Sequence, residues 1–377
     1  MSFLLLTSFG EVMIYIGYVL LAVLVLLVMI TVHELGHYIA GKSLGFGIEE
    51  FAIGFGPKIF SRKKADGEVF SVRLLPLGGF CAFKGEDAES EDATAFNNKV
   101  WWKRVIVLVS GALMNYLLAL LIVITMFGVY GNTALLAHKT VSGGTGYSEI
   151  NSLVDNDIIL KANGKNIYLT TDLMNAVENK QKGESVKLLI RRDGKNQELN
   201  LTLRGETDFK SVEDLGKLLT ALGISAQFDE QTGELIPTQS GLYSTRVKYG
   251  FFENIARSFE YTINLAGMVF RVFGQLITGA LGIKSLGGTI TTISITADAI
   301  RTGGMHNLLL ISSLIGVNLA VFNLLPIPAL DGARVVFTVI EGIRKKPINR
   351  RVEGLIHAVG FVLLLAFAVF IDLQQCF

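Results

Sequence analysis

The sequence predicts an α-helical polytopic membrane protein with four transmembrane helices, a membrane-associated β-hairpin and one inserted extracytoplasmic β-rich domain. Half of the 377 residues are hydrophobic and only 18% are charged, whereas a soluble domain is about one-quarter charged. Four long apolar runs are separated by polar segments. The longest polar segment, between the second and third runs, carries the alternating pattern of β-strands. Together these features indicate a membrane protein with a soluble insertion.

The four apolar runs set the boundaries of the predicted membrane segments. Residues 12–32 carry no charge and are long enough to cross a hydrocarbon core of about 30 Å as a helix. A cleaved signal peptide is not expected, because no basic residue precedes this run and it continues directly into a polar motif. The predicted segments are residues 1–45 with the first helix, 105–130 with the second, 307–332 with the third, and 355–377 with the fourth helix and the tail.

Lysine and arginine residues set the predicted orientation. They are frequent in the connection 46–104 and in the loop 333–354, and they are absent from residues 1–11 and 372–377. Because basic loops stay on the cytoplasmic side of the membrane, we expect both connections to be cytoplasmic. Both termini and the region between the second and third helices should then be extracytoplasmic.

Residues 135–205 are predicted to form a small β-rich domain that resembles a PDZ domain. An apolar strand ends at Asn163-Gly164, a pair typical of tight turns. A segment with helical spacing follows, and the next apolar stretch alternates around Asp193-Gly194 as a hairpin does. PDZ domains bind an extended peptide along a sheet edge. The alternative is a small β-rich domain of another kind.

The region 206–306 is predicted to be an extracytoplasmic linker that contains an interfacial amphipathic helix. Residues 251–283 are apolar but interrupted by charged residues, among them Arg257 and Arg271. A fifth transmembrane helix would place Arg271 in the middle of the membrane, which is costly. An amphipathic helix on the outer membrane surface avoids that cost. Residues 205–250 have no assignable pattern.

The motif His33-Glu34-Leu35-Gly36-His37, at the end of the first apolar run, predicts a metal site. Four positions apart in a helix, His33 and His37 place their imidazoles on one face, one turn apart. This geometry suits a zinc ion, with Glu34 beside it as a general base. The alternative is that the three are satisfied core residues. Because ionisable groups in a membrane segment are expensive and usually mark function, the motif favours zinc.

Asp331 is the predicted third ligand. Catalytic zinc sites use three protein ligands and leave one position open. Pro326 and Pro328 break the third helix just before Asp331, and irregular backbone at membrane depth is tolerated where it lines a cavity. The alternative is a helix-capping aspartate in a loop. We expect this carboxylate, rather than one of the remaining histidines, to complete the site.

The connection 46–104 is predicted to contain a β-hairpin directly after the metal-binding helix. Residues 51–55 alternate large apolar and small side chains, Asp66-Gly67 is a turn signal, and residues 69–75 read as the return strand. An exposed strand edge here would pair with an unwound substrate by β-addition. The alternative is a plain cytoplasmic hairpin.

With these motifs the chain resembles the site-2 protease family of intramembrane zinc metalloproteases. The bacterial branch that cleaves membrane-anchored anti-sigma factors is the most similar. The likeness rests on the first-helix motif, the PDZ-like insertion and the stretch NLLPIPALDG at 323–332. It implies that His33, His37 and Asp331 bind one Zn²⁺ per chain and that Glu34 is the catalytic base.

The resemblance also implies supporting residues and a cellular setting. Asn115 matches an asparagine of the family's second helix, and Asn323 matches one that precedes its Leu-Pro-x-Pro sequence. Both are expected near the site, with Asn323 bonding substrate or oxyanion. The hairpin is implied to be membrane-reentrant. Expected partners are the bilayer of the bacterial inner membrane and single-pass membrane substrates, such as anti-sigma factors or remnant signal peptides. Residues 285–295 depart from the family's pattern.

Other functional classes fit the sequence less well. A catalytically silent binding protein would use the PDZ-like domain without needing the intact motif. A metal transporter would more naturally show repeated halves and several intramembrane ligand sets. The net charge of +1 argues against nucleic acid as a partner. Cys81 and Cys376 lie far apart in the sequence and are expected to be free thiols.

Overall fold

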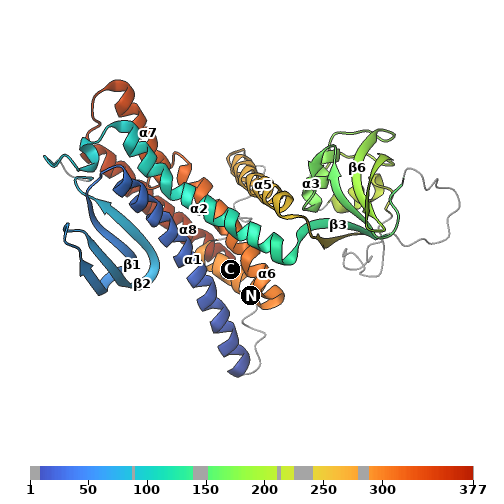
Figure 1. Ribbon diagram of the computed structural model, residues 1–377, viewed down its shortest axis with the longest axis horizontal. Coiled ribbons are helices and arrows are strands. Elements are labelled where there is room, and N and C mark those ends of the chain that lie inside the picture. The colour runs from blue at the N-terminus through green and yellow to red at the C-terminus, as the bar shows by residue number, and fades with distance from the viewer. Residues whose placement is uncertain are drawn as a thin grey trace. The chain divides into compact units, whose positions relative to one another are not determined.

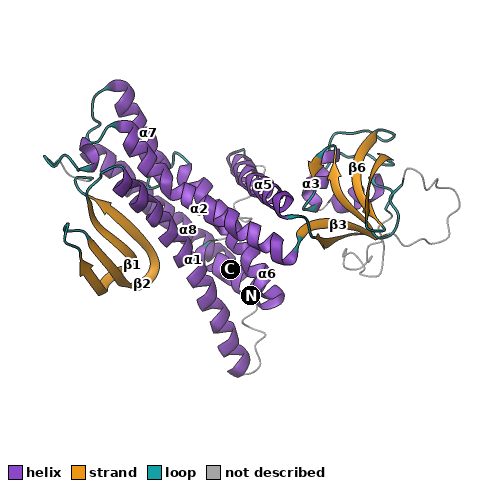
Figure 2. Ribbon diagram, in the orientation of Figure 1, coloured by secondary structure: helices purple, strands orange, loops and turns teal. Residues whose placement is uncertain are grey.

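The computed structural model divides into two compact units. One unit comprises Met1–Thr125 and Thr262–Phe377, and the other comprises Met126–Tyr261. Figure 1 shows the elements in chain order, and Figure 2 distinguishes helices from strands. The structure describes residues 9–86, 90–138, 152–209, 214–224, 241–278 and 288–376.

Four of the described helices, α1, α2, α6 and α8, are long and apolar enough to cross a membrane. This finding confirms the predicted polytopic membrane architecture with four membrane helices. The long helices of the chain are α1 (Phe9–Ser43), α2 (Trp101–Tyr130), α5 (Phe251–Ile277), α6 (Thr289–Leu324), α7 (Asp331–Arg344) and α8 (Arg350–Cys376), and a 3-10 helix spans Phe96–Asn98.

Helix α6 begins at Thr289, earlier than the predicted third membrane segment. Residues 289–303 contain several threonines and two charged side chains, so their sequence resembles a polar linker. At Gly304 the backbone leaves the helical region (φ 57°, ψ −141°), and the helix kinks there. The Asn307 side chain donates a hydrogen bond to the carbonyl oxygen of Ala299, at 3.0 Å, and so connects the two sides of the kink.

The polypeptide between α6 and α7 is not helical. Pro326 and Pro328 account for this break, because proline lacks an N–H donor and disfavours helical backbone in the residue before it. Asp331 is therefore the first residue of a separate helix, so the predicted third segment, residues 307–332, includes both the end of α6 and the start of α7. The predicted cytoplasmic loop 333–354 is also mostly helix, because α7 and the first turn of α8 occupy it.

The predicted hairpin after α1 is present as two long antiparallel strands, β1 (Ile48–Lys63) and β2 (Val69–Phe83). The hairpin folds back on itself, since Phe51 pairs with both Cys81 and Phe70. The first half of β1 thus lies between the two halves of β2. An apolar cluster of aromatic and aliphatic side chains packs the base of the hairpin against α2.

The folding of the hairpin back on itself determines which residues of β2 have no described strand paired on one side. Residues 69–72 pair with both halves of β1, whereas residues 79–81 pair on one side only among the described strands. Gly54 (φ 85°) and Gly78 (φ 103°) adopt left-handed backbone at the bends, which glycine does at no steric cost. The predicted return strand is therefore internal at its start, and the end of β2 forms an edge.

The second unit contains a six-stranded antiparallel sheet with the order β7-β6-β4-β3-β8, in which β5 pairs with β4. Both predicted turns, Asn163-Gly164 and Asp193-Gly194, have positive φ at both residues, as type I′ hairpin turns require. A core of buried aliphatic side chains joins the strands to helices α3 (Thr170–Val177) and α4 (Leu215–Ala221). The strands are β3 (Asn132–His138), β4 (Asp157–Ala162), β5 (Lys165–Asn166), β6 (Ser185–Arg192), β7 (Lys195–Thr202) and β8 (Gly241–Val247).

The β-rich unit extends beyond the predicted range 135–205. Strand β8, from the region without an assignable pattern, pairs with β3 along its whole length. Helix α4 also contributes buried leucines to the same core. A strand whose partner lies about a hundred residues away gives little local signal, because its alternation is only meaningful once the pairing is known. The β-rich region is confirmed, and the likeness to a PDZ domain stays a prediction.

Helix α5 is amphipathic, as predicted for this region, and it is not among the described helices that are apolar enough to cross a membrane. Arg257 is buried, with its Cζ atom 3.7 Å from the ring centroid of Tyr249 and an ion pair to Glu253 at 3.0 Å. Arg271 is exposed. The location of α5 at the membrane surface stays a prediction.

Candidate metal centre

Three side chains from two helices that are far apart in the sequence meet at one point. His33 Nε2 lies 3.0 Å from Asp331 Oδ2, and His37 Nε2 lies 3.1 Å from His33 Nε2 and 3.3 Å from Asp331 Oδ2. Both histidines belong to α1 and are buried, and Asp331 begins α7. Among the residues that the structure describes, this is the one group of His, Cys, Asp or Glu side chains arranged to hold a metal ion. The structure thus brings together the three side chains that were predicted from the sequence to be metal ligands.

The spacing of these three atoms suits a tetrahedral metal ion. Bonds of about 2.0–2.2 Å from zinc to nitrogen or oxygen place neighbouring ligand atoms roughly 3.3 Å apart. The observed separations are 3.0, 3.1 and 3.3 Å. The geometry therefore fits zinc without rearrangement of the side chains.

Contacts on the outer side of the imidazole rings leave their inner nitrogens free for a metal. His37 Nδ1 donates a hydrogen bond to the carbonyl oxygen of Val107, at 2.8 Å, so its Nε2 carries a lone pair. His33 Nδ1 lies 3.5 Å from Asn115 Nδ2 and 3.4 Å from Asn323 Nδ2. The two predicted asparagines thus flank the same ring nitrogen.

Asn115 also carries a polar atom without a partner. Its Oδ1 is buried and accepts no hydrogen bond from any described residue. With the amide turned over, Oδ1 accepts a hydrogen bond from His33 Nδ1–H, which leaves His33 Nε2 as a second lone pair. Two lone pairs and a carboxylate would then face one another, an arrangement that is costly unless a cation lies between them.

Glycines allow α2 to approach the ligands closely. A Cβ atom at Gly111 would lie 2.5 Å from His37 Nε2 and 2.7 Å from His33 Cε1. A Cβ atom at Gly36 would lie 2.4 Å from the carbonyl oxygen of Ser110. Neither role was predicted from the sequence. The available signal was a glycine on each of two membrane helices, since small residues mark close helix contacts in membranes.

Two further glycines bring other elements to the site. A Cβ atom at Gly332 would lie 2.3 Å from the carbonyl oxygen of Leu325, so α7 begins directly against the end of α6. A Cβ atom at Gly79 would lie 2.8 Å from the carbonyl oxygen of Ala52 and 3.6 Å from Glu34 Cγ. The free edge of β2 therefore runs beside Glu34.

Glu34 lies between two cavities that flank the ligand group. A cavity of about 490 Å³ is lined by Glu34, His37 and Asp331 together with residues of β2 and α8. A second cavity, of about 290 Å³, is lined by Glu34, His33 and Asp331 together with Asn323. Either volume is many times that of a water molecule, for which about 30 Å³ suffices. The site therefore has room for water and for an extended peptide next to the carboxylate.

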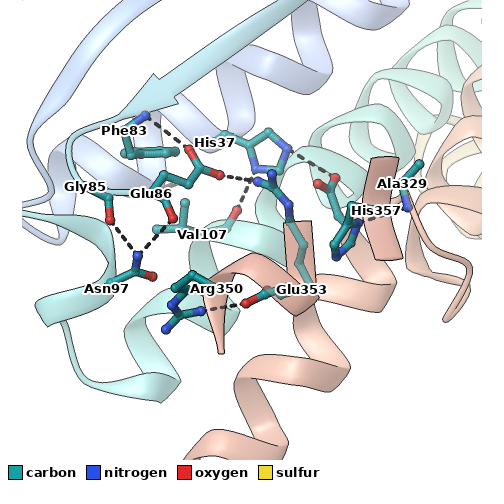
Figure 3. Close-up of polar contacts among 12 residues, drawn as sticks. His37, Phe83, Gly85, Glu86, Asn97, Val107, Ala329, Arg350, Glu353 and His357 are labelled. Carbon is teal, nitrogen blue, oxygen red and sulfur yellow. Dashed lines mark hydrogen bonds and ion pairs between the residues drawn. The ribbon is translucent and has the colours of Figure 1, made fainter. Parts of the chain in front are cut away.

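The other histidines of the chain lie outside the ligand group. His357 Nδ1 accepts a hydrogen bond from the backbone N–H of Ala329, at 3.0 Å (Figure 3). His306 lies beside Asn307 on α6. His138 belongs to the β-rich unit. The expectation of a carboxylate third ligand agrees with this arrangement.

These features define a class of protein. Helices of membrane length surround two histidines in H-E-x-x-H spacing, a third carboxylate ligand and a glutamate beside them. This combination is that of a membrane metallopeptidase, in which the glutamate of the motif serves as general base.

Comparison with known proteins agrees with this class. The chain matches peptidase family M50 over residues 21–367, and it belongs to that family. A Clostridium perfringens protein that is provisionally named a zinc metalloprotease is 32% identical over 367 residues, which cover 95% of this chain and 98% of the relative. The zinc metalloprotease RasP of Bacillus licheniformis is 29% identical over 432 aligned positions, which cover 92% of this chain and 96% of the relative. The regulator of sigma-W protease RasP of Bacillus subtilis is 27% identical over 450 positions, which cover 96% of this chain and 100% of the relative. The protein is a zinc metalloprotease.

Proposed function

We propose that this protein is an intramembrane endopeptidase that cleaves the transmembrane segments of single-pass membrane proteins. One observation carries the proposal. His33 and His37 are buried within a helix of membrane length, and Asp331 follows shortly after the end of another. A peptide bond reaches such a site most directly from within the membrane.

In this proposal His33, His37 and Asp331 hold the zinc ion, and Asn115 orients His33. When bound, zinc supplies Lewis-acid chemistry, which polarises the scissile carbonyl group and acidifies water. The buried setting of the ligands keeps bulk water away and strengthens these interactions.

Glu34 is the proposed general base. It takes a proton from the attacking water as the new carbon–oxygen bond forms, and it returns that proton to the amide nitrogen as the carbon–nitrogen bond breaks. Its place between the two cavities supports this role, because the water and the peptide need not displace any ligand. Asn323 lines the smaller cavity and is the proposed hydrogen-bond donor to the substrate or the oxyanion.

A transmembrane substrate presents one further problem. Its peptide bonds are shielded by helical hydrogen bonds, and unwinding them inside a membrane requires replacement partners. We propose that the free edge at residues 79–81 supplies these partners by β-addition. The pairing of these residues on one side only, and their position beside Glu34, support this assignment.

We propose that the β-rich unit is a PDZ-like domain on the extracytoplasmic side, which binds or screens substrates. Its antiparallel sheet, two short helices and type I′ turns are compatible with such a domain. The two outer strands, β7 and β8, each pair on one side among the described strands, so an edge is available to a peptide. The inferred orientation has both termini outside and the metal centre toward the cytoplasm, following the distribution of lysine and arginine.

We infer a role in regulated intramembrane proteolysis in the bacterial inner membrane. The name of the Bacillus subtilis relative, a regulator of sigma-W protease, supports membrane-anchored anti-sigma factors as one substrate class. Remnant signal peptides are a second class, because they also present a short apolar helix.

The test is cleavage of a model single-pass transmembrane substrate by the purified full-length protein in detergent. Glu34→Gln should lower the cleavage rate by at least about 10²-fold and leave the zinc content unchanged, because the base does not hold the metal. Glu49→Gln is the matched control, since Glu49 is exposed and lies outside both cavities.

Other outcomes have defined meanings. Equal cleavage by wild type and Glu34→Gln would show that the proposed mechanism is wrong. Zinc bound by both proteins without cleavage of any membrane substrate would favour a silent binding protein. Faster cleavage of an unstructured soluble peptide than of the transmembrane substrate would contradict the intramembrane assignment.

A further inference from the structure

The backbone just before Asp331 has an unusual conformation. Ala329 has a φ of 81°, in the left-handed region that residues with a Cβ atom seldom occupy. Such backbone persists only where surrounding contacts hold it. The next residue, Leu330, is extended, and Asp331 then begins α7. The direction of the Asp331 carboxylate therefore depends on how the backbone at Ala329 is held.

Helix α8 supplies two contacts that hold this backbone. The N–H of Ala329 donates to His357 Nδ1 at 3.0 Å, and Figure 3 shows the imidazole facing the Ala329 backbone. One turn further along α8, Pro328 packs against Gly360, where a Cβ atom would lie 2.4 Å from Pro328 Cβ. The two contacts hold consecutive residues of the segment between α6 and α7.

His357 is suited to this task by its protonation state. Because Nδ1 accepts the hydrogen bond from Ala329, the ring proton of the neutral imidazole lies on Nε2. Nε2 is buried and has no hydrogen-bond partner among the described residues. The ring also packs edge-to-face against Phe337, with centroids 5.7 Å apart. The hydrogen bond from Ala329 is thus the contact that requires a ring nitrogen at residue 357.

We infer that His357 is a positioning residue of the metal centre, which acts through the backbone of Ala329 to aim the Asp331 carboxylate at His33 and His37. Gly360 assists by admitting Pro328. The inference rests on the proposed role of Asp331 as a metal ligand. It assigns to α8, which provides none of the three ligands, control over the geometry of the third one.

The test is zinc affinity, measured by competition with a chelating dye on the full-length protein in detergent. His357→Leu should bind zinc at least about tenfold more weakly, as is usual when a group that orients a ligand is removed. His357→Asn keeps an acceptor close to the position of Nδ1 and should stay within about threefold of wild type.

Relief of the backbone strain provides a second, independent test. Glycine adopts the conformation of Ala329 without steric cost, so the geometry at 329 should then depend less on His357. Ala329→Gly should recover at least about threefold of the affinity lost in His357→Leu. A histidine that only stabilised α8 would not be rescued at residue 329.

Glycine substitutions on α8 give a matched pair. Gly360→Ala should weaken zinc binding by about tenfold, because the new methyl group would meet Pro328. Gly354→Ala lies on the same helix, where a Cβ atom meets nothing within 4 Å, and should leave zinc affinity unchanged. Elution as a single species on gel filtration and the unfolding temperature of the zinc-free protein serve as folding controls for every variant.

The outcomes separate this inference from the proposed function. Wild-type zinc affinity in His357→Leu would overturn the inference, and so would an equal loss in His357→Asn with no recovery from Ala329→Gly. Asp331→Asn should itself bind zinc far more weakly than wild type. Unchanged affinity in that variant would overturn the ligand assignment, and the positioning role with it.

Discussion

The imidazole of His37 donates its Nδ1 proton to the backbone carbonyl oxygen of Val107, at 2.8 Å. This bond connects α1 to α2 and sets the tautomer of His37, a proposed metal ligand. Substitution of a side chain cannot remove a backbone acceptor. It can, however, prevent the close approach of α2 that places this acceptor beside His37. The packing of α2 against the ligand atoms is therefore the first feature to test.

Gly111→Ala should weaken zinc binding by at least about tenfold, because the methyl group would come within 2.5 Å of His37 Nε2. Gly17→Ala is the control, since Gly17 lies in α1 and a Cβ atom there meets nothing within 4 Å. Zinc affinity by chelator competition measures both. Wild-type affinity in Gly111→Ala would show that α2 does not approach the ligands as closely as described.

Asn115 and Asn323 should differ in what their loss affects. Asn115 is fully buried beside His33, so Asn115→Leu should weaken zinc binding by roughly tenfold, while Asn115→Asp, which keeps an acceptor, should retain it. Asn323 faces the smaller cavity, so Asn323→Leu should lower kcat more than zinc affinity. The assignment of Asn115 as acceptor is wrong if its leucine and aspartate variants lose zinc equally.

Cys81 tests whether the larger cavity receives substrate. Its side chain lines that cavity at the free edge of β2. Cys81→Trp should lower kcat/KM by about tenfold or more through steric exclusion while zinc content is unchanged, and Cys81→Ala should stay within about twofold of wild type. Full activity of the tryptophan variant would show that the substrate does not bind in the larger cavity.

Glu341 links three helices on the side of the protein predicted to be cytoplasmic. Its oxygens bond Arg104 at 2.6 Å and Arg350 at 2.9 Å, and it accepts the N–H of Ile348 at 2.8 Å. Burial opposes ionisation, but the hydrogen bond and the two guanidinium groups outweigh it and hold the pKa of Glu341 below its ordinary value of 4.5. Breaking such a buried pair is strongly destabilising.

The direction of this pKa shift determines how the stability of the folded protein changes with pH. Because the pKa is lower in the folded than in the unfolded protein, the stabilisation from Glu341 is present above pH 4.5 and is lost as the pH falls through the lowered pKa. Glu341→Gln should lower the unfolding temperature at pH 7 and reduce the further decrease between pH 5 and about pH 3. Thermal unfolding in detergent, with Glu49→Gln as control, measures this. Parallel curves for wild type and Glu341→Gln would contradict it.

Residue types and spacing were enough to predict which three side chains meet, but not what surrounds them. His33 and His37 could be placed on one face because helical spacing is regular. Asp331 could be predicted because two prolines require irregular backbone just before it. The acceptor at Val107, the flanking glycines and the contact between His357 and Ala329 could not, because each joins parts of the chain whose separation carries no local pattern.

The same limit explains the errors in the fold. The apolar runs predicted four membrane helices, because hydrophobic length is a local property. The threonine-rich start of α6 and the strand β8 were missed, since packing against neighbours and pairing with a distant strand outweigh their weak local signals. The hairpin was predicted, but its doubling, which moves the free edge from residues 69–75 to residues 79–81, depends on contacts between its own two halves.

By itself, then, the sequence determined the membrane class of this protein, the metal-binding motif and the chemistry that a histidine pair, a carboxylate and a glutamate can perform. These properties follow from composition and from short-range periodicity. Only the tertiary structure decided that His33 and Asp331, 298 positions apart, lie 3.0 Å from each other, that the backbone of α2 covers them, and that α8 contacts the segment before Asp331. Such contacts are decided by packing, which depends on the shapes of all the neighbouring elements at once.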